Sequence, residues 1–383
     1  MEPAVLAPSP HGRVRLHVSI PRLLHNYRLL AGRCRAIRSS PIAVVKANAY
    51  GHGAVPIAKA LAEAGADFFA VSSLEEGLAL RPHLPHAKIL TLGYVPPSAA
   101  RLAAEAGLTL AVFDTAYARA LSESLGNQSL SVHVKVNSGM NRLGFSLARD
   151  RLSETVSEIS ELFSLRGLAP TGIFSHLATA DIPHASYTSE AVASFRTVLG
   201  ALALRGIRLP SHIAASAALL SGEGAGFPLS RFGLALYGYS PTREDLGLLP
   251  VARLCCDIAQ RYTAPAGAPV GYGATYITKQ RECIGILPVG YADGLPRAAQ
   301  GAFVTVGGVP CPLVGRISMD AAAVLLTDAP TDATTCTLFG DTPDSLWQLA
   351  DAAGTIPYEI LARLGPRVDR IYENEGSLYS HSG

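Results

Sequence analysis

Residues 42–71 read IAVVKANAYGHGAVPIAKALAEAGADFFAV, and this stretch determines the expected fold. It begins and ends with short runs that are typical of buried strands, IAVVKA (42–47) and FFAV (68–71). Between them, apolar residues recur three and four positions apart in VPIAKALAEAGA, as they do on one face of a helix. A strand, a helix and a second strand in this order predict a βαβ unit with two parallel strands.

The same alternation continues along the first two thirds of the chain. Further strand-like runs cover residues 88–92, 109–113, 131–136, 171–176, 211–215 and 228–231, and helical patterns such as ETVSEISELFSL (154–165) separate them. Eight strand–helix units in about 200 residues predict a parallel (β/α)8 barrel. We assign this α/β barrel, of the TIM type, to residues 12–242.

After residue 242 the pattern changes to short strands divided by glycine and proline. Examples are GILPVGYADG (285–294) and CPLVGRISMD (311–320), and one helical pattern follows at 343–354. Regular short runs with turn signals predict a second, mainly antiparallel β domain over residues 243–383. The boundary falls within residues 240–250, and residues 1–17 are able to pack with this second domain.

The composition excludes several classes of protein. The chain has 383 residues, of which 49% are hydrophobic and 16% charged, and its net charge is +2. We expect no nucleic-acid partner, because basic residues form no run, and no membrane segment, because no apolar run could cross a bilayer. The first thirty residues do not resemble a secretory signal, so we expect a cytoplasmic protein. The six cysteines lack metal-binding spacing, which favours reduced thiols and no metal site.

Several polar residues fall where the barrel strands are expected to end. They are Lys46 after the first strand, Lys135 and Asn137 at the fifth, His176 at the sixth, Ser216 after the seventh and Arg231 at the eighth. The carboxyl ends of the strands in such a barrel surround one pocket, where catalytic side chains gather. The sequence therefore predicts a functional site at this end.

Lys46 has two interpretations. Its stem could pack against the barrel while its ammonium reaches water. Alternatively, a desolvated lysine near other cations can attack an aldehyde and form a Schiff base. The loops after the last two strands, which often hold phosphate, offer Ser216 in AASAA and Gly233 in SRFG. Each alone is an ordinary turn residue, but together with Lys46 they favour a phosphate-bearing aldehyde cofactor.

A set of motifs in fixed order resembles the alanine racemases, which are pyridoxal-phosphate enzymes built from a barrel and a β domain. The motifs are VVKANAYGHG (44–53), VKVNSGMNRLGF (134–145), GIFSHLATAD (172–181), HIAASAA (212–218), RFGLALYG (231–238), GYGATY (271–276), PVGYADGLPR (288–297), GRISMD (315–320) and GTIPYE (354–359). The resemblance covers nearly the whole chain. It implies an amino-acid racemase that interconverts L-alanine and D-alanine and supplies D-alanine for peptidoglycan.

The resemblance also implies how the cofactor is held. Lys46 would form the Schiff base with pyridoxal 5'-phosphate, and the residues matching the phosphate site are Tyr50, Ser216, Gly233 and Tyr358. Arg231 matches the residue that faces the pyridine nitrogen. A guanidinium can donate but cannot accept a proton, so the ring nitrogen stays unprotonated and the cofactor is a weaker electron sink.

Racemisation needs one base on each face of the cofactor. The resemblance assigns these roles to Lys46 and Tyr272, with a network running from Tyr272 through His176 to Arg231. A free tyrosine has a pKa of about 10, so the second base must be made more acidic by its surroundings. Without the resemblance, His176 could be a hydrogen-bonded core histidine and Tyr272 a simple turn residue.

Other residues are assigned to the substrate by the same resemblance. Arg142 and the backbone amide of Met319 match the groups that bind the substrate carboxylate, and Asp320 lies in the same turn as Met319. In similar proteins the lysine that matches Lys135 is often carbamylated, which would let it orient Arg142. Because Met319 and Tyr272 lie in the second domain, the resemblance implies a head-to-tail homodimer with shared active sites.

The sequence departs from the family pattern at a few positions. Ala215 stands where asparagine is common, Phe232 where proline is usual and Asn137 where aspartate is frequent, while Ser318 is at a position that varies. None of these is a proposed base. The competing functions are a serine or broad-specificity racemase, a pyridoxal-phosphate decarboxylase of the same architecture, and a non-catalytic carrier that resembles only the barrel.

Overall fold

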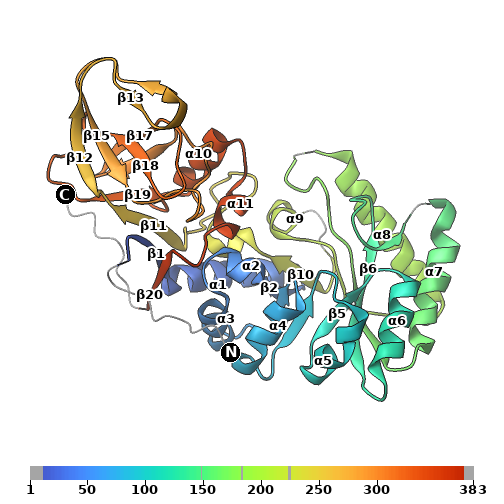
Figure 1. Cartoon of the computed structure of the whole chain (residues 1–383). Coiled ribbons are helices and arrows are strands. Elements are labelled where there is room, and N and C mark those ends of the chain that lie inside the picture. The colour runs from blue at the N-terminus through green and yellow to red at the C-terminus, as the bar shows by residue number, and fades with distance from the viewer. Residues whose placement is uncertain (1–11, 148, 183, 223–225, 375–383) are drawn as a thin grey trace.

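The computed structural model describes residues 12–147, 149–182, 184–222 and 226–374. Figure 1 shows a barrel, coloured blue to yellow-green, beside a β-rich body in orange and red. Eight parallel strands form the barrel: β2 (Ser40–Val44), β3 (Phe68–Val71), β4 (Lys88–Thr91), β5 (Thr109–Val112), β6 (Leu130–Asn137), β8 (Leu168–Phe174), β9 (Ser211–His212) and β10 (Leu229–Phe232). Strand β6 pairs with both β5 and β8, which closes the ring. The predicted barrel is thereby confirmed.

Two strands end three residues before their predicted ends, and both differences lie at the mouth of the barrel. The expected strand 42–47 ends at Val44, and Lys46 instead begins the short α2 (Lys46–Tyr50). The expected strand 211–215 ends at His212. There the side chain of Arg231 donates a hydrogen bond to the carbonyl oxygen of Ile213 at 3.0 Å. In a longer strand, this carbonyl would be available to pair with a neighbouring strand.

Helices cover the outside of the barrel, as their apolar spacing predicts. The main ones are α1 (Ile20–Ala36), α3 (Ala54–Glu63), α4 (Leu74–Leu80), α5 (Ala100–Glu105), α6 (Thr115–Leu125), α7 (Leu152–Glu161) and α8 (Ser186–Leu204). On α7, for example, Val156 and Ile159 are buried, while the intervening Ser157 and Glu158 face outward. This three-residue spacing places one face of the helix in the core.

The second body is built on a nine-stranded sheet that is antiparallel except for one pair. Its order is β12 (Gln260–Ala264), β15 (Glu282–Leu287), β18 (Ala322–Leu325), β17 (Val309–Val314), β16 (Phe303–Val306), β19 (Thr335–Phe339), β11 (Ala252–Asp257), β1 (Val14–Ser19) and β20 (Asp369–Glu373). The short β13 (Pro269–Val270) and β14 (Tyr276–Ile277) form a separate hairpin. The predicted mainly antiparallel architecture is confirmed, with β1 and β20 as its parallel pair.

Strand β1 comes from the beginning of the chain but belongs to this second sheet. It pairs antiparallel with β11 and buries Val14, Leu16 and Val18 on one face. Two helices, α10 (Pro343–Ala353) and α11 (Pro357–Ala362), complete this body, and α11 reaches toward the barrel mouth (Figure 1). Within the described residues, no helix has the length and apolar character that crossing a bilayer would require.

Candidate active site

A cavity of about 850 Å³ opens at the carboxyl end of the barrel strands. The ionisable side chains that line it include four cations, Lys46, Lys135, Arg142 and Arg231, two carboxylates, Glu76 and Asp181, together with His176, Tyr50 and Tyr358. Ser216 and Gly233 also contribute to the wall. The structure therefore brings most of the predicted site residues into one space with an excess of positive charge.

Lys46 stands at the head of a turn with an unusual backbone. Ala47, Asn48, Ala49 and Tyr50 all have φ between 51° and 54°, which is the left-handed region that non-glycine residues rarely occupy. Hydrogen bonds fix the turn, including Ala49 N–H to the carbonyl of Val45 at 2.9 Å. Four such residues together cost roughly 4–8 kcal/mol, and backbone strain of this kind collects at functional sites.

The surroundings of Lys46 favour its neutral amine. Burial lowers the pKa of Lys46 from its usual value, and the positive charges of Arg142 and Arg231 lower it further. Glu76 acts in the opposite direction but is the weakest of these influences. A neutral amine can act as a nucleophile or as a base, so the site gives Lys46 the chemistry that the sequence suggests.

Lys135 lies close to the same cations at the end of β6. Burial lowers its pKa to about 8, and Arg142 and Arg231 contribute further. Its ammonium lies 5.6 Å from the centre of the Phe174 ring. Among the described residues no carboxylate forms an ion pair with Lys135 or with Arg142, which leaves both cations available for an anion.

Arg231 is buried and distributes its donors among neutral acceptors. It donates to the carbonyl of Ser175 at 2.8 Å and to His176 Nδ1 at 3.1 Å, and it also donates to His212 Nδ1. Burial, and then the charge of Arg142, lowers its pKa to about 10. Because a guanidinium can only donate, the facing nitrogens of both histidines must carry lone pairs.

This contact determines the state of His176. Burial, followed by the charge of Arg231, lowers the pKa of His176 to about 3, so the ring is neutral near pH 7. Its proton must then be on Nε2, since Nδ1 accepts from Arg231. His176 lines the cavity, and its Nε2–H can donate a hydrogen bond to an oxygen atom there.

At the far end of the cavity, the backbone of Gly233 lies close to Tyr50, and Tyr358 lies beside Tyr50. Ser216 Oγ accepts from the backbone N–H of Gly233 at 3.1 Å, and Ser216 is the first residue of α9 (Ser216–Ser221). A Cβ atom on Gly233 would lie only 2.3 Å from Tyr50 Oη, so only glycine fits. The rings of Tyr50 and Tyr358 lie 6.1 Å apart, and burial raises the pKa of both, so that each remains a donor.

Three predicted site residues lie apart from this cavity. Tyr272 is 71% exposed and Met319 is 53% exposed, and both are on the β-rich body. Tyr272 lines a different hollow of about 390 Å³ together with Ser318. Asp320 is also exposed and forms an ion pair with Arg367 at 2.7 Å. A single chain therefore does not join Tyr272 to His176.

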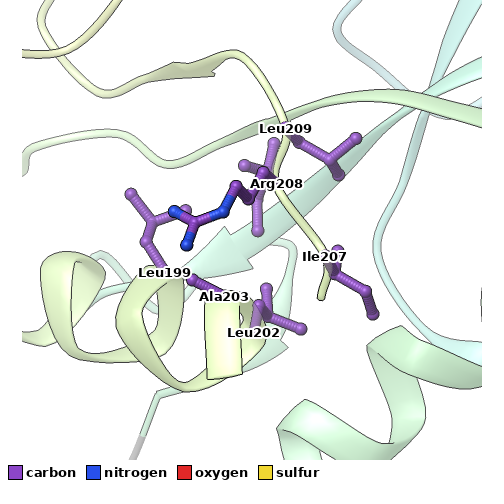
Figure 2. A pocket seen from close by; sticks show the side chains of 7 residues that line it. Leu199, Leu202, Ala203, Ile207, Arg208 and Leu209 are labelled. Carbon is purple, nitrogen blue, oxygen red and sulfur yellow. The ribbon is translucent and has the colours of Figure 1, made fainter. Parts of the chain in front are cut away.

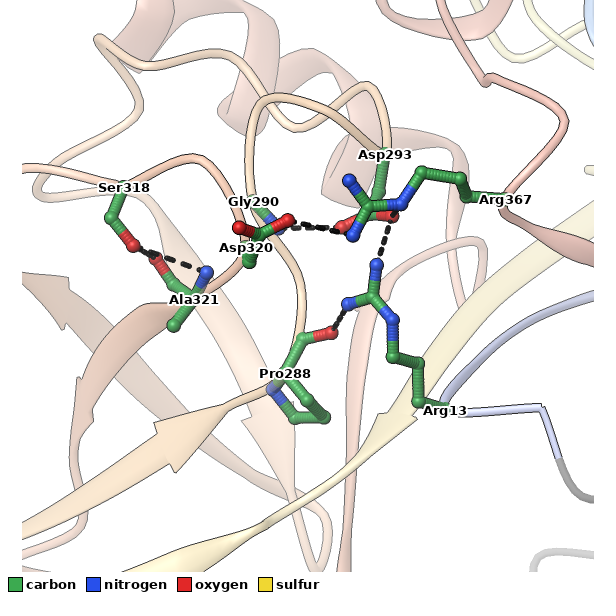
Figure 3. Close-up of polar contacts among 8 residues, drawn as sticks. All are labelled: Arg13, Pro288, Gly290, Asp293, Ser318, Asp320, Ala321 and Arg367. Atoms are coloured by element: carbon green, nitrogen blue, oxygen red, sulfur yellow. Dashed lines mark hydrogen bonds and ion pairs between the residues drawn. The ribbon is translucent and has the colours of Figure 1, made fainter.

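Polar contacts hold the turn formed by residues 318–321, which includes Met319, and the neighbouring loop of Gly290 and Asp293; Figure 3 shows Ser318, Asp320 and Ala321 of this turn. Buried Asp293 accepts from Arg13 at 2.6 Å and lies 3.3 Å from Arg367, and its second oxygen accepts from the N–H of Gly290 at 2.9 Å. The N–H of Ala292 in turn donates to the carbonyl of Met319 at 3.1 Å. The turn is therefore fixed to the neighbouring loop, and the side chain of Met319 is exposed.

Sequence reasoning missed Glu76, which lines the cavity beside Lys46. The available signal was the spacing Ser73-x-x-Glu76, which usually marks only the start of a helix. It also missed His212 as a partner of Arg231, although HIAASAA was noted. A smaller apolar pocket of about 150 Å³ lies between α8 and residues 207–209, and it contains none of the predicted site residues (Figure 2).

Comparisons with known proteins identify the family of the chain. A model of the alanine racemase N-terminal domain matches residues 18–241, and one of the C-terminal domain matches residues 251–372. Alanine racemase 2 of Caldanaerobacter subterraneus subsp. tengcongensis is 36% identical over 380 residues, covering 95% of this chain and 96% of its own. The alanine racemase of Symbiobacterium thermophilum is 39% identical over 349 residues, which cover 87% of this chain and 90% of that protein.

Solved structures show the same likeness. The alanine racemase from D-cycloserine-producing Streptomyces lavendulae superposes with a TM-score of 0.88 at 33% identity, covering 97% of this chain and all of that one. The alanine racemase from Bacillus anthracis with bound L-Ala-P superposes with a TM-score of 0.87 at 34% identity, covering 96% of this chain and 97% of that one. Fold and cavity thus define a two-domain enzyme of the barrel and β-domain class. The chain belongs to the alanine racemase family, which confirms the resemblance drawn from its motifs.

Proposed function

We propose that this enzyme interconverts L-alanine and D-alanine with pyridoxal 5'-phosphate as cofactor. One observation carries the proposal: the desolvated amine of Lys46 faces a cavity with an excess of cations, in a chain of the alanine racemase family. Such a cavity suits a substrate with a carboxylate and a cofactor with a phosphate. The decarboxylase and carrier alternatives are less well supported, because the family matches span both domains.

The cavity has features that fit the cofactor. The close approach of Gly233 to Tyr50, and the hydroxyl of Ser216, provide a narrow polar end for a phosphate, which Tyr358 would complete. Lys46 would bind the aldehyde group, and Arg231 and His176 would help to hold the pyridine ring. When bound, pyridoxal phosphate would supply an electron sink that acidifies the α-proton of an attached amino acid.

Two bases of this protein would then move the proton. We assign one face to Lys46, whose neutral amine can accept a proton at Nζ. We assign the other face to the phenolic oxygen of Tyr272. The Nε2–H of His176, which Arg231 fixes in place, can donate to that oxygen and stabilise its anionic form. Return of the proton by the opposite base gives the mirror-image product.

The shared site requires a homodimer, because Tyr272 and Met319 are absent from the cavity of their own chain. We propose that the β domain of each subunit completes the cavity of its partner. The exposure of both side chains supports this arrangement, since it leaves them accessible to a partner subunit. A fully active monomer in analytical ultracentrifugation would contradict it.

Arg142 and the backbone N–H of Met319 are assigned to the substrate carboxylate, with Asp320 supporting the turn. Lys135 is assigned as a carbamate: its ammonium group loses one proton, and the neutral amine then adds to carbon dioxide and releases a second proton, which together convert a cation into an anion. The lowered pKa of Lys135, about 8, increases the share of neutral amine that can react. The resulting anion would orient Arg142 through charge-assisted hydrogen bonds.

We further propose that the enzyme works in the cytoplasm and supplies D-alanine for peptidoglycan. All six cysteines are free, as expected in a reducing compartment. Alanine is preferred over larger amino acids in this proposal, and a serine or broad-specificity racemase is the nearest alternative.

The test is to incubate the purified enzyme with L-alanine in heavy water. Deuterium at the α-carbon and loss of optical rotation are expected to appear together. Release of carbon dioxide would indicate a decarboxylase, deuterium without inversion a one-base enzyme, and neither change a carrier. Parallel reactions with L-serine measure the substrate preference.

A further inference from the structure

The left-handed turn after Lys46 contains no glycine, so its own sequence does not favour the conformation. Ala47, the residue next to the reactive lysine, lies at φ 51° and ψ 51°. A right-handed helical turn would be less strained and would send the Lys46 side chain in a different direction. Contacts from elsewhere in the chain therefore add to the hydrogen bonds within the turn in maintaining it.

Glu76 contacts Ala47, the residue next to Lys46. Its Oε1 accepts from the backbone N–H of Ala47 at 2.6 Å, and its Oε2 accepts from the N–H of Ser72 at 2.7 Å. Ser72 directly follows β3, while Ala47 comes shortly after β2. One carboxylate thus connects the ends of two neighbouring barrel strands, and both hydrogen bonds have the short lengths of charge-assisted bonds.

This role goes beyond starting a helix. In a Ser-x-x-Glu capping box, the glutamate usually bonds to the N–H of the capping serine, here Ser73. Ser73 Oγ does accept from the N–H of Glu76 at 3.3 Å. The Glu76 carboxylate, however, reaches one residue further back to Ser72 and uses its other oxygen on Ala47. Helix capping alone does not require the second contact.

Glu76 also stands out by its charge. The other ionisable groups of the cavity come from several elements. They are Lys135 on β6, Arg142 in the loop after β6, His176 after β8, Arg231 on β10, and Tyr50, Asp181 and Tyr358 on the wall. Glu76 is the carboxylate whose charge acts directly on Lys46. Its loss would remove the carboxylate that raises the pKa of Lys46 against the effect of Arg142 and Arg231.

We propose that Glu76 is a positioning residue for Lys46, which directs the amine by holding the left-handed turn and offsets the surrounding positive charge. It is not itself a catalytic residue, because its hydrogen bonds go to backbone amides. The inference rests on the proposed role of Lys46 as a base, and it extends that role to a residue outside the motifs of the sequence.

Three variants separate geometry from charge. Glu76→Gln keeps the size of the side chain but removes the charge and one acceptor. Glu76→Asp keeps the charge, but its shorter side chain cannot span both N–H groups. The matched control is Glu75→Gln, which removes the same charge from the same helical turn at an exposed position that does not line the cavity.

The first measurement needs neither cofactor nor turnover. Cofactor-free protein is treated across a pH series with an amine-selective acylating reagent, and labelling of Lys46 is quantified by peptide mass spectrometry. Glu76→Gln should label Lys46 about threefold faster or more near neutral pH, because the amine loses its offsetting anion. Glu75→Gln should match the wild type. Equal labelling in Glu76→Gln and wild type would overturn the charge role.

The second measurement is racemisation by the cofactor-loaded enzyme. Both Glu76 variants should lose about 10- to 100-fold in kcat with little change in KM, since a base displaced by about 1 Å costs rate more than binding. Glu76→Asp should keep the wild-type pH profile, whereas that of Glu76→Gln moves to lower pH. If Glu76→Asp matches Glu75→Gln in kcat, the positioning role is refuted. An inactive wild type would instead refute the proposed function, and the labelling result would remain readable.

Discussion

Replacing Gly233 with alanine tests the proposed phosphate end of the cavity by a steric argument. The added Cβ would lie 2.3 Å from Tyr50 Oη and 2.9 Å from its Cζ, whereas ordinary contact begins at 3.4 Å. The φ of Gly233 is −114°, outside the left-handed region, so the effect comes from space rather than from φ strain. The phenol must move by about 1 Å, taking 3.4 Å as the nearest ordinary contact.

Tyr50 has little freedom to move, because it is buried against Tyr237, with ring centres 4.9 Å apart. A hydrogen bond from its hydroxyl to a phosphate contributes about 1.5–3 kcal/mol, and displacement would remove much of it. Gly233→Ala should therefore weaken pyridoxal phosphate binding by roughly 10- to 100-fold. The assay is a titration of cofactor-free protein, followed by absorbance and checked by equilibrium dialysis.

Two controls make this prediction specific. Gly200→Ala, on α8 with nothing within 4 Å of the new Cβ, should leave cofactor affinity unchanged. Tyr50→Phe already removes the hydrogen bond to the phosphate, together with the nearest clashing atom. Combining it with Gly233→Ala should therefore weaken binding only slightly beyond Tyr50→Phe alone. Wild-type affinity in Gly233→Ala, or fully additive losses in the double variant, would refute the reasoning.

Three further predictions concern other parts of the molecule. Tyr272→Phe should reduce racemisation by roughly 10²- to 10⁴-fold while bound-cofactor absorbance persists, and near wild-type turnover would exclude Tyr272 as a base. Burial lowers the pKa of His52 from 6.5 to about 4, so the folded state resists protonation of this ring. His52 alone should lower the free energy of unfolding by about 3 kcal/mol between pH 7 and pH 4. Urea titrations at several pH values should show that the free energy of unfolding depends less steeply on pH in His52→Gln than in the wild type. The same slope in both proteins would contradict this assignment. In the same assay, Asp293→Asn should lower the free energy of unfolding by about 1–3 kcal/mol, because Asp293 is buried. Asp257 is exposed, so Asp257→Asn should lower it by less than about 1 kcal/mol. Equal losses in the two variants would show that burial does not determine the contribution of these carboxylates.

Much of the fold could be predicted from the sequence because its signals are local. Runs such as FFAV and the helical spacing around Ile57 determine strand and helix without distant partners. The barrel then follows from alternation alone. The early end of β9 could not be predicted, because it depends on the Arg231 side chain, which lies nineteen residues beyond His212 and competes for the carbonyl of Ile213.

The site, like the fold, could be predicted only where local sequence determines it. The residues at strand ends, Lys46 and Lys135 among them, could be placed from their position in the barrel. The left-handed turn could not, since the letters ANAY after Lys46 indicate an ordinary helix and the contact that holds it comes from Glu76. The tautomer of His176 likewise depends on Arg231, a contact across the barrel that spacing does not reveal.

The position of β1 between β11 and β20 has a consequence for how the chain is made. The ribosome completes β1 long before it reaches β11, and residues 20–251 must be added first. At about 5–20 residues per second, this strand waits roughly ten to fifty seconds for a partner. Val14, Leu16 and Val18 stay without their final neighbours during that time. A fragment cut at the start of the second domain would lack the strand altogether and would leave two unprotected sheet edges prone to aggregation.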